Sequence, residues 1–157
     1  MFRVMLIALM MAAPAAAQNV TFGGMRADTS APVEVTADNL TVTQSDNNAL
    51  FSGNVVIGQG DMRLSADQVT VQYGAGGQNR IASLTARGNV VLVSGDDAAE
   101  AQQADYDVDG GTVTLIGDVT LVQGQNVLAG DRMVVDLATG AAQVQGRVRS
   151  ILQPGGN

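Results

Sequence analysis

The chain has 157 residues, with 8 basic side chains against 15 acidic ones, a formal net charge of -7 at pH 7, and no His, Cys or Trp. All the basic residues are Arg, so the chain also lacks Lys. These absences exclude Ser-His-Asp and Cys-His nucleophilic sites, the usual zinc sites, a Lys Schiff base and a Walker-type phosphate loop, and the acidic balance argues against a nucleic-acid partner. The length is that of one domain, and no disulfide can support it.

Residues 1–17 are predicted to be a cleavable secretory signal peptide. Arg3 supplies the positive charge, and residues 4–13 form an apolar run that is shorter than the roughly 20 residues needed to span a bilayer. Residues 15–17 are Ala and form a small-residue cleavage site. The alternative is a retained membrane anchor. The signal peptide predicts an exported chain, either secreted or periplasmic, and residues 18–31 are predicted to be a flexible segment before the folded domain.

From residue 32 onward the chain reads as β-structure, because apolar and polar residues alternate and no helical period is sustained. The clearest alternating sets are Ala49, Phe51, Val55 and Ile57, then Leu84, Ala86, Val90 and Leu92, then Val113, Leu115, Val119 and Leu121. Such alternation predicts strands with one buried and one solvated face.

A glycine element recurs four times within these strands. Gly53, Gly88, Gly117 and Gly146 are each followed by a polar residue and Val, at spacings of 35, 29 and 29 residues. A glycine in the middle of a strand marks a bend, a bulge or a close backbone approach. In three copies another glycine follows seven residues later and marks a turn.

A second element interrupts the alternation. At Ala37-Asp38, Ala66-Asp67 and Gly130-Asp131 the apolar positions change parity across a step of three residues. An odd step inserts one extra residue, which predicts a bulge or corner that the Asp side chain can stabilise. Ala104-Asp105 is taken as the matching site of the third copy, although the parity does not change there.

Each repeat of about 30 residues is therefore predicted to be an up strand, a turn, a down strand and a corner. Repeats with an exposed apolar face must stack to bury it. Stacked antiparallel hairpins with corners give two facing sheets joined along one side, which is a curved jelly roll or a flattened solenoid. The predicted fold class is all-β.

Several strings resemble the LptA/OstA-like family of periplasmic lipopolysaccharide-transport proteins. They lie at residues 32–38, 51–56, 60–67, 86–91 and 115–121, and the resemblance covers about residues 31–148. It implies a V-shaped, slightly twisted antiparallel β-jelly roll at 32–152. Residues 153–157 depart from the family pattern, since they are only polar residues, Gly and Pro, and are predicted to be a disordered tail. It also implies an interior that holds lipopolysaccharide acyl chains, and head-to-tail assembly that bridges inner-membrane and outer-membrane barrel complexes. No catalytic residue, metal or cofactor is expected.

The residues predicted for these roles fall into two sets. The interior lining comprises the inward parity at Val35, Leu40, Val42, Phe51, Val55, Ile57, Met62, Leu64, Val69, Val71, Leu84, Val90, Leu92, Val113, Leu115, Val119, Leu121, Leu128, Met133 and Val135. The partner edge strands comprise Val33, Glu34, Val35 and Thr36 at one end and Val144, Gln145, Gly146, Arg147 and Val148 at the other.

The same residues also permit interpretations that involve no lipid ligand. The apolar residues can pack as an ordinary sandwich core, and the chain can be a secreted structural or adhesive β-solenoid without a lipid ligand. A carbohydrate-active β-helix enzyme is a weaker alternative, because no general acid or metal site can be named. Asp105, Asp107 and Asp109 project from one strand face, but their spacing matches no calcium loop.

Overall fold

The computed structural model describes residues 20–21, 28–75 and 80–154. The predicted signal peptide lies outside these residues, as do parts of the segment 18–31 and of the tail 153–157, so the predicted domain limits stay a prediction. No helix of the described residues is long and apolar enough to cross a membrane. Where regular structure is described, it is strand.

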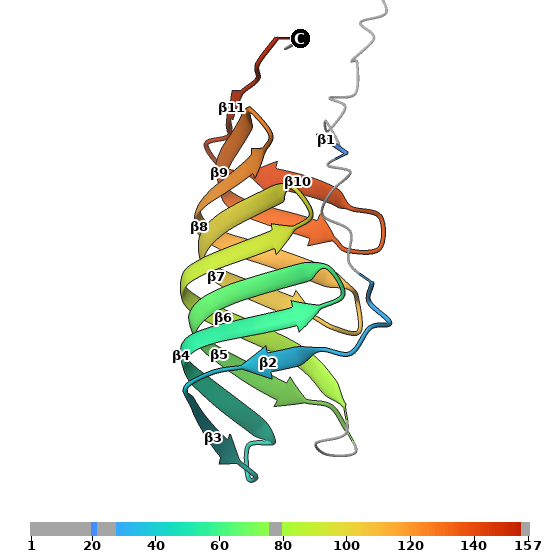
Figure 1. Cartoon of the computed structure of the whole chain (residues 1–157), viewed down its shortest axis with the longest axis vertical. Coiled ribbons are helices and arrows are strands. Elements are labelled where there is room, and N and C mark those ends of the chain that lie inside the picture. Colours follow the sequence, from blue (N-terminus) through green and yellow to red (C-terminus); the bar gives the residue numbers. More distant parts are fainter. Residues whose placement is uncertain (1–19, 22–27, 76–79, 155–157) are drawn as a thin grey trace, which may run out of the picture.

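The described residues form eleven antiparallel strands in one continuous sheet (Figure 1). They are β1 (Val20–Thr21), β2 (Glu34–Thr36), β3 (Asn39–Thr43), β4 (Asn48–Gln59), β5 (Met62–Tyr73), β6 (Ile81–Ser94), β7 (Asp97–Asp107), β8 (Thr112–Gln123), β9 (Asn126–Asp136), β10 (Ala141–Gln145) and β11 (Arg149–Ile151). From β4 to β10 each strand pairs with the next in the chain, β2 and β3 both pair with β4, β10 and β11 both pair with β9, and β1 returns to pair with β10.

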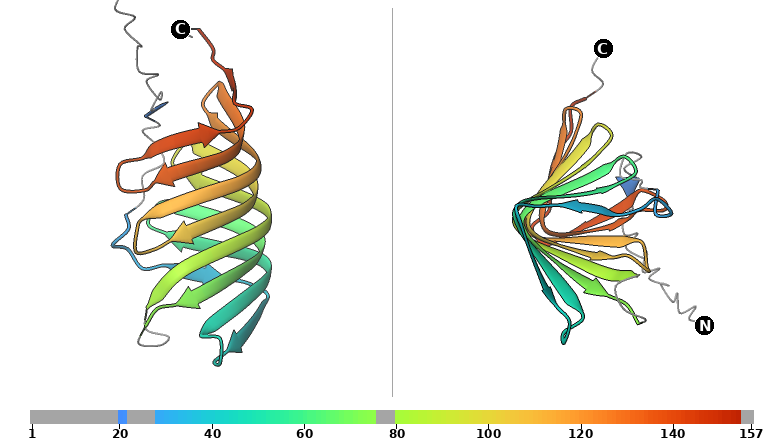
Figure 2. Two further views of the ribbon diagram at one scale, coloured as in Figure 1. Left: turned by 180° about the vertical axis from the view of Figure 1, so that it is seen from behind. Right: turned by 60° about the horizontal axis from the view of Figure 1, so that its bottom comes forward.

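The long strands β4 to β9 bend in the middle, and this bend folds the sheet into a V (Figure 2). The first wall holds β2, the later halves of β4, β6 and β8, the earlier halves of β5, β7 and β9, and β11. The second wall holds β3, the other halves of β4 to β9, and β10. The bends lie along the apex, and the hairpin turns lie on the opposite side, which we call the open side. The predicted all-β, V-shaped antiparallel architecture is confirmed.

The bends are built by the two sequence elements acting together. In β4, Gly53 has φ of 80°, Asn54 has φ of 48°, and the pairing with β5 skips between Ser52 and Val55. The Asn54 side-chain amide donates to Asp38 Oδ2 at 2.9 Å. A Cβ on Gly53 would lie only 2.8 Å from the same oxygen, so glycine is required both by its left-handed backbone and by this close approach.

The same arrangement recurs in β6. The Asn89 amide donates to Asp67 Oδ2 at 2.9 Å, and a Cβ on Gly88 would lie 2.5 Å from that oxygen. The corner Asp and the strand glycine, predicted separately from the sequence, therefore face each other across a strand pair.

The prediction for the third corner is wrong. The pairing of β7 with β8 skips between Glu100 and Gln103, and the inward positions change from Ala101 to Ala104, so the corner lies at Ala101-Gln102 and not at Ala104-Asp105. Gln102 replaces the Asp and donates its amide to Asp118 Oδ2 at 3.0 Å. Because Ala is only weakly apolar, its inward parity gave no signal in the sequence.

Candidate functional site

Three rows of inward side chains run through the molecule in register. On the second wall they are Leu40, Phe51, Val69, Ala86, Ala104, Leu115, Met133 and Val144, and beside them Val42, Ala49, Val71, Leu84, Tyr106, Val113, Val135 and Ala142. On the first wall they are Val35, Ile57, Leu64, Leu92, Ala99, Leu121, Leu128 and Ser150. Cross-strand pairing therefore gathers side chains from all the repeats onto the two facing walls of one interior.

Most of the predicted lining lies in this interior with at most 4% of its surface exposed. These buried residues are Val55, Ile57, Met62, Leu64, Val69, Val71, Leu84, Val90, Leu92, Val113, Leu115, Val119, Leu121, Met133 and Val135. Val35, Phe51 and Leu128 are partly buried against them. The walls are thus in contact through the middle of the molecule.

Leu40 and Val42 are on the inward face but remain 56% and 46% exposed. They belong to β3, which pairs only with β4 among the described strands. The rows therefore end in uncovered apolar side chains at this end of the V.

The interior also opens at the other end. A groove of about 420 Å³, which we call the C-terminal groove, is lined by both walls: Leu121, Gln123, Asn126, Val127, Leu128, Ala142, Val144, Val148, Ser150 and Leu152. Its volume is in the range of small-molecule sites. It opens the apolar interior at the C-terminal end of the V.

A polar row that the sequence interpretation missed lines the first wall next to the open side. Gln59, Ser94 and Asp97 occupy inward positions there and are at most 4% exposed, and Gln123 donates its amide to Asp97 Oδ2 at 3.4 Å. The Tyr106 hydroxyl, from the second wall, donates to Gln59 Oε1 at 2.6 Å. Burial raises the pKa of Tyr106, and the nearby Asp107 carboxylate acts in the same direction. This row separates the apolar interior from the open side.

The predicted partner residues lie at the two edges of the sheet. Glu34, Val35 and Thr36 form β2, with Val33 just before it, while Val144 and Gln145 end β10. Gly146, Arg147 and Val148 make the corner between β10 and β11, and Arg147 has φ of 46° like the other corner residues. The edges also include β3 and β11, which the sequence interpretation did not identify as edge strands.

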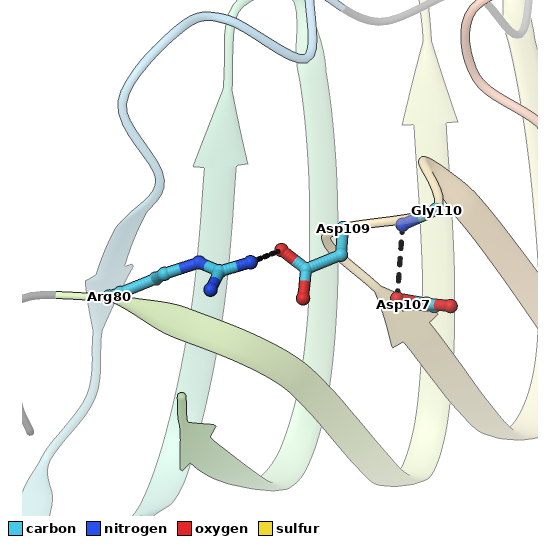
Figure 3. Close-up of polar contacts among 4 residues, drawn as sticks. All are labelled: Arg80, Asp107, Asp109 and Gly110. Atoms are coloured by element: carbon cyan, nitrogen blue, oxygen red, sulfur yellow. Dashed lines mark hydrogen bonds and ion pairs between the residues drawn. The ribbon is translucent and has the colours of Figure 1, made fainter. Parts of the chain in front are cut away.

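The alternating acids at the end of β7 and in the turn after it have local partners. Asp105 accepts from the Gln103 amide at 3.1 Å, Asp107 accepts from the Gly110 N–H at 3.1 Å, and Asp109 pairs with Arg80 (Figure 3). Within the described part of the chain, no three acidic side chains are grouped as a metal site would require. Their observed contacts are those of turns and a solvated ion pair.

Comparisons with known proteins agree with this architecture. Residues 34–141 match the family described as "LptA/(LptD N-terminal domain) LPS transport protein". An uncharacterised protein of Rhizobium meliloti (strain 1021) is 31% identical over 153 residues, which cover 91% of this chain and 82% of that protein. The fold is similar, with a TM-score of 0.71 and 21% identity, to the crystal structure of LptH, the LptA homologous periplasmic component of the conserved lipopolysaccharide transport device from Pseudomonas aeruginosa; the match covers 82% of this chain and 99% of LptH. The family match spans most of the described sheet, and the chain belongs to the LptA/(LptD N-terminal domain) LPS transport protein family.

Proposed function

We propose that this chain is a periplasmic lipopolysaccharide-binding transport protein that shields the lipid acyl chains between the two walls of the V. The observation that carries the proposal is the set of apolar rows that continue in register through every repeat of a chain of this family. The protein acts as a non-enzymatic carrier in outer-membrane assembly, and its driving energy is supplied elsewhere.

Binding relies on apolar burial. Each acyl CH₂ group removed from water contributes about 0.8 kcal/mol, and this contribution does not depend on orientation. An acyl chain can therefore slide along the apolar rows without breaking specific polar contacts. The formal net charge of -7 repels lipid phosphates, which keeps the headgroups outside the interior.

The strand pairing inside the chain predicts how a second copy docks. The pairing of β4 with β5 is applied to the C-terminal edge of one copy and the N-terminal edge of the next. Inside the chain, β4 meets β5 with Ser52 opposite Gln68 and Val55 opposite Ala66. By repeat position, Ser52 and Val55 correspond to Gln145 and Val148 of the C-terminal edge, while Gln68 and Ala66 correspond to Asn39 and Ala37 of the N-terminal edge. A second copy docked in this register therefore places Asn39 opposite Gln145 and Ala37 opposite Val148.

This register keeps the apolar rows in phase across the joint. Leu40 of the second copy falls opposite Val144, and its Val42 falls opposite Ala142. The side chains that are exposed at the N-terminal end are thereby buried, and the C-terminal groove joins the interior of the next copy. Because β1 pairs with Ala141 and Ala142 in the isolated chain, the joint displaces β1.

The apex of the joint carries charged side chains. In this register Arg147 takes the place of Asn54, and Asp38 of the second copy takes the place of Asp67 on the following strand. Inside the chain, Asn54 and Asn89 donate to the Asp of the preceding strand, so the matching carboxylate for Arg147 is Asp131 of its own chain. The same two edges are the surfaces offered to homologous components anchored in the inner membrane and in the outer-membrane barrel.

Binding of fluorescent lipopolysaccharide by the purified mature chain tests the function. We expect saturable binding that lipid A displaces, because lipid A carries the acyl chains, and that the deacylated core oligosaccharide does not displace. Absence of binding would favour the structural solenoid, and equal competition by the deacylated oligosaccharide would contradict acyl-chain recognition.

A further inference from the structure

Residues 28–31, which we call the strap, cross the open side of the V outside the sheet (Figure 1). A Cβ on Gly60 would lie 3.4 Å from Cβ of Asp28, and a Cβ on Gly111 would lie 3.7 Å from Cγ2 of Thr29. Gly60 is in the β4–β5 turn of the first wall, and Gly111 immediately precedes β8 on the second wall. The strap therefore lies close beside the rims of both walls.

One buried side chain joins the strap to both walls. The Gln59 amide of the first wall donates to the backbone oxygens of Thr29 and Ala31, at 3.3 and 3.0 Å. The same Gln59 accepts from the Tyr106 hydroxyl of the second wall at 2.6 Å. Gln59 is only 2% exposed, so these contacts are made away from solvent.

The strap is a preformed turn with little apolar contact. The Ser30 N–H donates to Asp28 Oδ1 and the Ala31 N–H donates to Asp28 O, both at 3.0 Å. The hydrogen bonds from the Ser30 side chain and backbone lower the pKa of Asp28. Asp28, Thr29 and Ser30 are exposed, and the first strand paired with β4 begins only at Glu34. Few polar contacts hold the strap, and water can replace them, so it can detach while the sheet stays intact.

Away from the strap, buried side chains close the part of the interior that the structure describes. The rows on both walls are buried through the middle of the molecule, and the C-terminal groove opens at one end. Gln59 and Tyr106 connect the two walls directly at the open side.

We propose that the strap is a releasable closure of the open side, latched by Gln59 and Tyr106, and that acyl chains enter between the walls when the latch opens. This inference rests on the proposed lipid-binding function. It adds a lateral route of uptake to the route through the ends of the V, and it assigns the control of that route to two buried polar side chains.

A disulfide that locks the strap tests the proposal. The chain has no cysteine, so Asp28→Cys with Gly60→Cys forms a single pair at a Cβ separation close to that of natural disulfides. We expect the oxidised variant to take up fluorescent lipopolysaccharide at least about tenfold more slowly than the same sample after reduction, because the disulfide keeps the strap from detaching; tenfold in rate corresponds to about 1.4 kcal/mol in the barrier. Equal uptake rates before and after reduction would contradict the proposal that the strap closes the open side.

A second variant loosens the strap instead of locking it, and it does not need the disulfide to form. Tyr106→Phe removes the hydroxyl that holds Gln59 and is expected to speed uptake several-fold. The control is Tyr73→Phe, because Tyr73 lies instead among Thr43, Gln44, Asn47 and Asn48. If Tyr106→Phe takes up lipid at the wild-type rate, the proposed role of Tyr106 in holding the strap closed is wrong. Failure of the wild type to bind lipopolysaccharide at all would instead reject the proposed function, so the two failures are distinguishable.

Discussion

At each bend a glycine stands against a polar side chain of the neighbouring strand, and this contact fixes where the two walls meet. Gly88 is the tightest of the internal cases, with φ of 82° and Asp67 Oδ2 at 2.5 Å from the position of a Cβ. Gly95 has a similar left-handed backbone, with φ of 58°, but no atom lies within 4 Å of its Cβ position. The two glycines therefore separate the cost of backbone strain from the cost of the close approach.

Gly88→Ala is expected to destabilise the fold by about 2–4 kcal/mol. The left-handed backbone costs an L-residue about 1–2 kcal/mol, and the Cβ also pushes Asp67 away from Asn89. Gly95→Ala carries only the backbone cost. Urea denaturation of both variants measures the difference, and equal losses would show that the close approach does not contribute.

The phenol of Tyr106 makes stability depend on alkaline pH. Its pKa is raised in the folded state by burial, so the folded chain keeps the proton to higher pH than the unfolded chain. The contribution is fully present below the unfolded pKa of about 10 and is lost as the pH rises through the folded pKa. We expect the stability advantage of the wild type over Tyr106→Phe to shrink above about pH 10, as measured by denaturation at several pH values. A difference that stays constant up to pH 11 would contradict this assignment.

At the scale of the element, the corners repeat one geometry, while the side chains at the third and fourth corners differ from those of the first two. Asp38 and Asp67 accept from an Asn, whereas at the third corner Gln102 donates to Asp118. The donor and the acceptor have exchanged strands, but one hydrogen bond across the bend is retained.

A swap at the third corner tests this equivalence. Gln102→Asp alone places two carboxylates together and removes the donor, which is expected to cost about 0.5–1.5 kcal/mol at this exposed site. Adding Asp118→Asn restores the pairing of the other corners and is expected to recover most of the loss. Thermal denaturation of the single and double variants decides it, and a double variant no more stable than the single would show that the corners are not equivalent.

The strands and the bends at Asp38, Asp67 and Asp131 follow from the sequence, because the inward residues on either side of each bend are large and apolar. Val55, Ile57 and Leu64 alternate clearly, and the mid-strand glycines mark the bends. The third corner did not follow, because Ala101 and Ala104 carry too little hydrophobicity to reveal a change of parity. The polar row at Gln59 was also not predictable, because its burial depends on Tyr106 from a distant repeat and on the strap.

At the scale of the whole molecule, one end of the V exposes apolar side chains and the other end has an open apolar groove. The inward Leu40 is 56% exposed at the N-terminal end, while the C-terminal groove lies open at the other. In the register proposed for assembly, each end completes the other. The predicted lining positions near both ends are therefore candidates for assembly as well as for lipid contact.

Leu40→Asp is expected to weaken self-association about tenfold or more, because burial of a Leu side chain contributes about 1.5–3 kcal/mol and a carboxylate cannot be buried there without cost. Leu50→Asp is the matched control, since Leu50 is 36% exposed and lies on the outward face of the adjacent β4. Sedimentation equilibrium of the three proteins measures the effect. Equal association of Leu40→Asp and the wild type would remove the support for this joint.

Photo-crosslinking from neighbouring residues on opposite faces tests lipid carriage most directly. A photoreactive amino acid at Leu121 or Val144 faces the interior, whereas one at Val122 or Gln143, the adjacent positions, faces outward. In cells that transport lipopolysaccharide, we predict adducts to the lipid from Leu121 and Val144 and none from Val122 and Gln143. Adducts from the outward positions alone, or equally from both faces, would contradict an acyl-chain path between the two walls.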